Sequence, residues 1–143
     1  RVDNAYLTQL IRMRQTGLLK IEDIQDHSLV HRVCNDKYFA ENRFRYLVEW
    51  DPVSLLQTDD RFLPLHYTAC QSTIQGFRCA FELGVRYYPI KKGISLLFTK
   101  DNERDTPYQL ACTKFGRDKV MKVIEETLLL SSQQQQQQQP QEQ

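Results

Sequence analysis

The sequence lacks the features that mark several broad classes of protein. Its five glycines and five prolines are dispersed rather than periodic, which excludes a collagen-like chain. Its four cysteines show no Cys-x-x-Cys spacing, which argues against a disulfide framework or a zinc ribbon. The longest apolar run, Ile94 to Phe98, is interrupted by Ser95 and is far shorter than a bilayer span. These absences leave an ordinary soluble globular protein as the expectation.

An excess of either charge is also missing. The chain has 19 basic and 18 acidic side chains, and its net charge of +1 is spread evenly along the sequence. The basic footprint of a nucleic-acid-binding protein is therefore not evident. No apolar segment of the kind found in secretory signals follows the N-terminus, so the cysteines are expected to be reduced. The sequence predicts an intracellular protein, cytoplasmic in the first place, with the nucleus as the alternative.

Catalytic and metal-binding signatures are scarce. No glycine-rich phosphate loop occurs, and no cysteine is singled out as a nucleophile with a base beside it. His66 precedes Cys70 by four residues, and His31 precedes Cys34 by three. Each pair could share a helix face, yet no further ligand cluster accompanies them, so these cysteines are better explained as compact core residues. The sequence predicts no enzyme activity, no metal site and no cofactor.

What the sequence does contain is helical periodicity over the length of one domain. Its 143 residues, 41% of them hydrophobic, suffice for a buried core. Four sets of mainly apolar residues recur at helical spacing, which predicts an all-α fold. The sets are Tyr6, Leu7, Leu10, Ile11, Arg14 and Leu18; Phe44, Leu47, Val48 and Leu55; Phe77, Ala80, Phe81 and Gly84; and Val120, Val123, Ile124, Thr127 and Leu128. Gly17 predicts the end of the first helix.

Residues 131–143 differ in composition from the rest of the chain. Two serines precede seven consecutive glutamines, Gln133 to Gln139, and the segment has no apolar side chain. Such a segment cannot offset the entropy of ordering by burial, so we expect a disordered, low-complexity tail. A continuation of the preceding helix for a turn or two is the alternative.

One phrase of the sequence occurs more than once. Leu63 to Ala69 (LPLHYTA) is similar to Thr106 to Cys112 (TPYQLAC), 43 residues later, and more faintly to Ser28 to Cys34. A polar turn precedes the two clearer copies, and a second apolar helix follows every copy. We therefore expect repeats that begin near residues 24, 60 and 101, after an N-terminal capping helix in residues 1–23. The spacing between the two clearer copies exceeds the usual repeat length of about 33 residues, and the excess at Tyr87 to Phe98 predicts an inserted loop.

The residue types of the phrase also suit the start of a helix. Pro64 and Pro107 suit the first turn of a helix, where a backbone N–H is not needed. The hydroxyl of Thr106 is placed to cap its helix. Leu63 has no side-chain acceptor, which predicts a poorer cap for the helix of the middle repeat.

These residues resemble the helix-opening phrase of the ankyrin-repeat family, Thr-Pro-Leu-His-x-Ala, and the resemblance covers about residues 24–128. The second copy departs from the phrase, with Tyr108 and Gln109 where the family has Leu and His. The resemblance implies a short ankyrin-like solenoid in which His31 and His66 hydrogen-bond the backbone between neighbouring repeats, with Gln109 as a partial substitute. It also implies a non-catalytic module that binds a protein partner through its repeat face.

Three groups of side chains are expected to contact that partner. They are the turn tips Asp59, Asp60, Arg61, Phe62, Asn102, Glu103 and Arg104, the first-helix positions Tyr67, Gln71, Thr113 and Lys114, and Tyr87, Tyr88, Lys91 and Lys92 in the insertion. The insertion mixes aromatic and basic residues, as interface hot spots do, although its tyrosines could also pack onto the repeat or stack on nucleic acid. The alternative function is a nucleic-acid-associated regulatory factor whose glutamine tail drives assembly.

Overall fold

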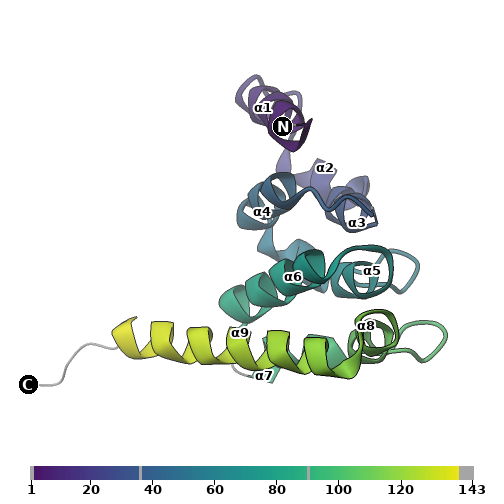
Figure 1. The fold of residues 1–143 in the computed structure, drawn as a ribbon. Helices are drawn as coiled ribbons and strands as arrows, with labels where there is room; N and C mark the ends of the chain where they lie inside the picture. Colours follow the sequence, from purple (N-terminus) through teal and green to yellow (C-terminus); the bar gives the residue numbers. More distant parts are fainter. Residues whose placement is uncertain (1, 36, 90, 139–143) are drawn as a thin grey trace, which may run out of the picture.

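The chain is helical, and the prediction of an all-α fold is confirmed. The computed structural model describes residues 2–35, 37–89 and 91–138 (Figure 1). Its elements are α1 (Val2–Gln15), α2 (Ile21–Asp26), α3 (Leu29–Cys34), α4 (Glu41–Trp50), the 3-10 helix η1 (Pro52–Leu56), α5 (Pro64–Gln71), α6 (Ile74–Tyr87), α7 (Lys91–Ser95), the 3-10 helix η2 (Leu96–Phe98), α8 (Pro107–Phe115) and α9 (Arg117–Gln138). No β-strand occurs in these ranges, and Asp59 and Phe62 form an isolated bridge.

The helices stack in two rows. The first row consists of α3, α5 and α8, and each of these helices packs against the next. The second row consists of α1, α4, α6 and α9, which also pack in that order. Within each layer a first-row helix packs against the second-row helix that follows it, so that α3 pairs with α4, α5 with α6 and α8 with α9. Figure 1 shows these layers one above another, from α1 at the top to α9 at the bottom.

The core lies between the two rows. Phe44 of α4 and Phe77 of α6 are among its largest fully buried side chains. The predicted apolar sets on α4, α6 and α9 pack into this core. The set on α1 is the exception, because this helix lies at the end of the stack and has no buried residue. Leu10 packs against the core, whereas Tyr6 and Leu18 are exposed, contrary to the prediction.

Ion pairs connect the second-row helices. Each of them joins a helix to its neighbour in the row: Arg43–Asp3 (2.8 Å), Arg45–Glu82 (3.7 Å) and Arg78–Glu126 (2.9 Å). Asp3 also accepts hydrogen bonds from the backbone N–H groups of Asn42 and Arg43 in the first turn of α4. Ala40, at the N-cap position of α4, has no polar side chain. A carboxylate of α1 therefore caps α4 in its place.

The two clearer copies of the repeated phrase open helices as predicted. Pro64 and Pro107 occupy the first positions of α5 and α8. The Thr106 hydroxyl accepts a hydrogen bond from the Gln109 N–H (3.1 Å), and the Gln109 side-chain oxygen accepts one from the Thr106 N–H (3.0 Å). This reciprocal pair is a capping box. Leu63 has no such acceptor, so the predicted difference between the two caps is confirmed.

Most of the described residues between Tyr87 and Phe98 are helical rather than an irregular loop. After α6 the chain forms α7 and η2, and Leu96 and Leu97 are buried against the rest of the stack. Gly93 is required here, because a Cβ at this position would lie 2.8 Å from the Cα of Val85. The expected loop is thus a short helix packed on the C-terminal end of α6.

The last helix extends into the glutamine tract. α9 runs through Ser131 to Gln138, so the disorder expected from residue 131 is not found over these residues. The alternative, that the preceding helix continues for a turn or two, matches the structure. Residues 139–143 lie outside the described part of the chain. Among the described helices, none combines the length and the apolar character that crossing a bilayer requires.

Candidate functional site

Two tight turns project from the first row of helices. The first turn tip, residues 59–62, is closed by two backbone hydrogen bonds between Asp59 and Phe62, each 2.9 Å long. Its central residues, Asp60 and Arg61, both have positive φ angles, +50° and +67°. These angles define a type I′ turn, which usually holds glycine, asparagine or aspartate. An arginine in this backbone conformation is uncommon.

The second turn tip, residues 101–105, has the equivalent position in the next layer. The carboxylate of Asp101 accepts hydrogen bonds from the N–H groups of Glu103 (2.8 Å) and Asp105 (2.9 Å). Arg104 has a φ of +65°, as Arg61 does in the first tip. The Asn102 amide reaches the Asp60 carbonyl at 3.4 Å, so the two tips are neighbours. Figure 1 shows them as two loops beyond α5 and α8.

Buried histidines tie each tip to the first-row helix of the preceding layer. His31 of α3 donates from Nε2 to the Gln57 carbonyl (2.8 Å), just before the first tip. His66 of α5 donates from Nε2 to the Thr99 carbonyl (2.9 Å), just before the second tip. These are the hydrogen bonds between layers that were expected of the two histidines.

The hydrogen bonds of His66 also fix its protonation. Its Nδ1 accepts from the Leu63 N–H (3.0 Å), so the proton must lie on Nε2, which faces a carbonyl. Burial lowers the pKa of His31 and of His66 below the ordinary value of 6.5. Both rings are therefore neutral donors at pH 7, and their role is structural. Gln109, at the position equivalent to His66, accepts the corresponding hydrogen bond from the Thr106 N–H at the start of α8.

Aromatic rings fill the space between the first tip and the first row. Phe62 lies 5.6 Å from the Tyr67 ring and 6.0 Å from the His66 ring, measured between centroids. Tyr67 also meets His31 edge to face at 6.0 Å. Burial raises the pKa of the Tyr67 hydroxyl, which contacts the Asp59 carbonyl at 3.4 Å. Phe62 and Tyr67 are half-buried, so part of each side chain packs beneath the tip and part remains accessible to solvent.

The exposed part of this surface comes from the tip residues and the first-row helices. The tip side chains of Asp60, Arg61, Asn102, Glu103 and Arg104, and the helix side chains of Gln71, Thr113 and Lys114, are all exposed. We call this surface, together with the half-buried Asp59, Phe62 and Tyr67, the first-row face.

The insertion is not brought together with the first-row face. Tyr87 and Tyr88 are half-buried and pack against the core at the end of α6. Figure 1 shows α7 below α9, away from the two loops beyond α5 and α8. Lys91 and Lys92 are exposed in that separate region. Its tyrosines serve packing, which was one of the interpretations that the sequence left open.

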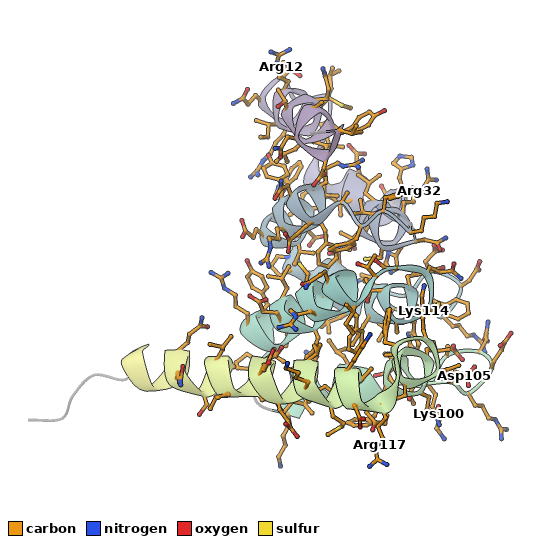
Figure 2. All side chains as sticks on the ribbon, in the orientation of Figure 1. Arg12, Arg32, Lys100, Asp105, Lys114 and Arg117 are labelled. Carbon is orange, nitrogen blue, oxygen red and sulfur yellow. The ribbon has the colours of Figure 1, made fainter. Side chains whose placement is uncertain are left out.

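The first-row helices also differ from the second row in charge. Together, α3, α5 and α8 contain Arg32 and Lys114 but no carboxylate. Both cations are exposed, and Figure 2 shows them on the side formed by the first-row helices. Lys114 donates to the Cys70 carbonyl (3.2 Å) at the end of α5, whereas the Arg32 side chain has no partner among the described residues. Arg32 was not predicted as a site residue, because the copy of the phrase that contains it, Ser28 to Cys34, is the faintest of the three.

Two of the four thiols are buried, and their burial opposes ionisation. Burial raises the pKa of Cys79 to about 12 and that of Cys34 well above its usual value, so both remain protonated. All four cysteines are free. The described part of the chain contains no group of three or more His, Cys, Asp and Glu side chains that could hold a metal ion.

Comparisons with protein families, with curated protein sequences and with solved structures found no match for this chain.

Proposed function

We propose that the chain is an ankyrin-like repeat module, without catalytic activity, that binds a protein partner through its first-row face. One observation carries the proposal: each turn tip is tied to the preceding first-row helix by a buried, neutral histidine. The exposed side chains of successive layers are thereby held in register on one rigid surface. A surface preorganised in this way costs less conformational entropy when a partner binds.

The ankyrin-like architecture is supported by three features that agree with one another. Helix pairs stack in two rows, the clearer copies of the phrase open equivalent helices, and the histidines of the phrase bond to the next layer. Repeats of this kind bury their apolar faces only against each other, which produces an extended stack with one long surface free for binding.

The binding role is supported by side chains that have no structural task. Asp60, Arg61, Glu103 and Arg104 make no side-chain hydrogen bond or ion pair within the residues that the structure describes. Arginine is enriched at binding hot spots, as is tyrosine, which the face supplies through Tyr67. The second row differs, since Arg43, Arg45 and Arg78 are engaged in ion pairs between its helices.

Affinity capture from a native cell lysate tests the proposal. The bait is the full chain, compared with Gln71→Trp combined with Thr113→Trp, which adds bulk at two exposed positions of the first row. The matched control is Glu49→Trp combined with Lys122→Trp, at exposed positions of the second row. We expect a protein that survives nuclease treatment, is captured by the wild type and the control, and is lost with the first-row variant.

Capture that is equal for all three baits would refute the first-row face as the binding site. Material that disappears entirely on nuclease treatment would instead favour association with nucleic acid. Circular dichroism of each variant shows that a loss of capture does not come from unfolding.

A further inference from the structure

The two turn tips carry arginines at equivalent positions of successive layers. Arg61 and Arg104 are 43 residues apart, the same offset that relates the two clearer copies of the repeated phrase. Both are exposed, and both have a φ between +65° and +67°. An acidic residue directly precedes each of them, Asp60 in one tip and Glu103 in the other. The chain therefore presents an arginine with a positive φ in each of the two tips.

Neither arginine has a task within the fold. Neither guanidinium makes a hydrogen bond or an ion pair with any described residue, although Arg43, Arg45 and Arg78 of the second row all do. A residue with a Cβ is also strained at a positive φ, where glycine is not. Local stability alone would favour glycine or asparagine at both positions. An unfavourable residue that occurs twice without a partner is a sign of function.

We infer that Arg61 and Arg104 bind carboxylates of an acidic, extended segment of the partner protein. The inference rests on the proposed function, because it assigns a partner chemistry to the first-row face. A guanidinium can hold a carboxylate with two parallel hydrogen bonds, which gives both strength and orientation. Arginine is enriched at interfaces, whereas aspartate and glutamate are depleted, so the arginines rather than the adjacent acids are the recognition elements.

The spacing of the tips fits such a segment. The tips are neighbours, since Asn102 of one reaches the Asp60 carbonyl of the other. Packed helices lie about 8–10 Å apart, so the tip arginines repeat at about the thickness of one layer. Alternate side chains of an extended peptide lie on the same face about 7 Å apart. The flexible arginine side chains can take up the difference, so that one peptide engages both tips.

The surrounding charge favours a carboxylate peptide over a nucleic acid. Arg32 and Lys114 add positive charge on the first-row helices, which contain no carboxylate. Figure 2 shows Lys100 on the same side of the molecule, next to the second tip. The tips also carry five carboxylates. Asp101 is buried and accepts two backbone N–H bonds, and Asp59 and Asp105 are half-buried. Asp60 and Glu103 are exposed beside the tip arginines and would repel a continuous phosphate backbone. A peptide can avoid them by placing uncharged residues between its carboxylates.

Fluorescence anisotropy with defined probes tests the inference on the full chain. The first probe is a labelled twelve-residue peptide with alternating glutamate and threonine, and the second replaces every glutamate with glutamine. A twelve-nucleotide oligo-dT serves as the nucleic-acid probe. We expect the glutamate peptide to bind about tenfold more tightly than the glutamine peptide and than the oligo-dT at 50 mM salt.

The decisive variant is Arg61→Gly combined with Arg104→Gly. Glycine relieves the strained backbone at both tips, so the melting temperature should not fall below that of the wild type. Affinity for the glutamate peptide should fall about tenfold. The charge-matched control is Arg12→Gln combined with Lys122→Gln, on α1 and α9, and it should change the affinity less than about twofold.

Three results would overturn the inference: no binding of the glutamate peptide at millimolar concentration, equal affinity of the glycine variant, or tighter binding of oligo-dT. These results are distinguishable from a failure of the proposed function. If the captured partner is lost with the bulky first-row variant but retained with the glycine variant, the binding face stands and the carboxylate recognition does not. If neither variant affects capture, the face itself is refuted.

Discussion

The two rows of helices are joined by different chemistry. Neutral histidines join the first row to the next layer by hydrogen bonds to backbone carbonyls. Arginine–carboxylate pairs join the second row, and their side chains are all partly exposed. Arg43, Arg45 and Arg78 of the second row are therefore paired with carboxylates, whereas Arg61 and Arg104 at the first-row tips have no ion-pair partner among the described residues. This difference is the physical reason for placing recognition on the first row.

The largest effect is expected where the first row enters the core. Leu65 of α5 is 4% exposed, and Leu65→Ala removes a buried side chain between the rows. The variant should lose about 2–5 kcal/mol of stability, as buried leucines do when they are truncated. Urea denaturation followed by circular dichroism measures the loss. An unchanged midpoint would mean that the helix pairs do not pack as described.

Breaking the hydrogen bonds of His66 should cost nearly as much. His66→Leu keeps a buried apolar group but leaves the Leu63 N–H and the Thr99 carbonyl without their partner. Two unsatisfied backbone groups cost about 2–4 kcal/mol in total. Gln109→Leu is the control, because Gln109 bonds only within its own helix start and is exposed. Equal losses in the two variants would contradict a special role for the bond between layers.

Lowering the pH below 6.5 should reduce the stability of the fold through the two buried histidines of the first row. Burial lowers the pKa of His31 and His66, so the unfolded chain binds protons more readily than the folded chain below pH 6.5. The stability contributed by the neutral rings is present above pH 6.5 and is lost as the pH falls toward the folded-state pKa values. Each histidine contributes a slope of at most about 1.4 kcal/mol per pH unit.

Urea midpoints measured between pH 7.5 and pH 5 show this slope directly. The slope should become smaller in His66→Leu, which removes one of the two buried rings. A slope that is the same in the variant and the wild type would place the acid sensitivity elsewhere.

The smallest effect is expected from the ion pairs of the second row. Arg78 and Glu126 are joined at 2.9 Å, but their side chains are 36% and 42% exposed, so solvent screens the pair. A double-mutant cycle with Arg78→Gln and Glu126→Gln should give a coupling of about 0–1 kcal/mol that decreases with salt. A coupling free energy as large as the stability loss in His66→Leu would contradict the expectation that the ion pairs of the second row contribute less than the histidine bonds of the first.

Local features of the sequence predicted local structure well. Proline at the start of a helix and threonine at its cap need no distant partner, so Pro64, Pro107 and Thr106 could be interpreted from their neighbours alone. The bonds of His31 and His66 to the next layer were expected only from the resemblance to the ankyrin-repeat family, since no local feature of the sequence indicates a partner more than 20 residues away.

Contacts outside the repeat pattern could not be predicted. The capping of α4 by Asp3 joins residues 39 and 40 positions apart and leaves no periodic signal. The packing of α7 against α6 depends on the close approach of Gly93 to Val85, which a single sequence does not show. Candidate site residues within the repeats were therefore brought together, whereas those in the insertion were not.

Hydrogen exchange of the full chain, alone and with the captured partner bound, tests the central claim most directly. The account predicts that binding slows exchange in residues 57–62 and 99–105 and in α5 and α8, with α4 and α9 unchanged. Protection confined to the second-row helices, with the two turn tips exchanging as in the free chain, would contradict it.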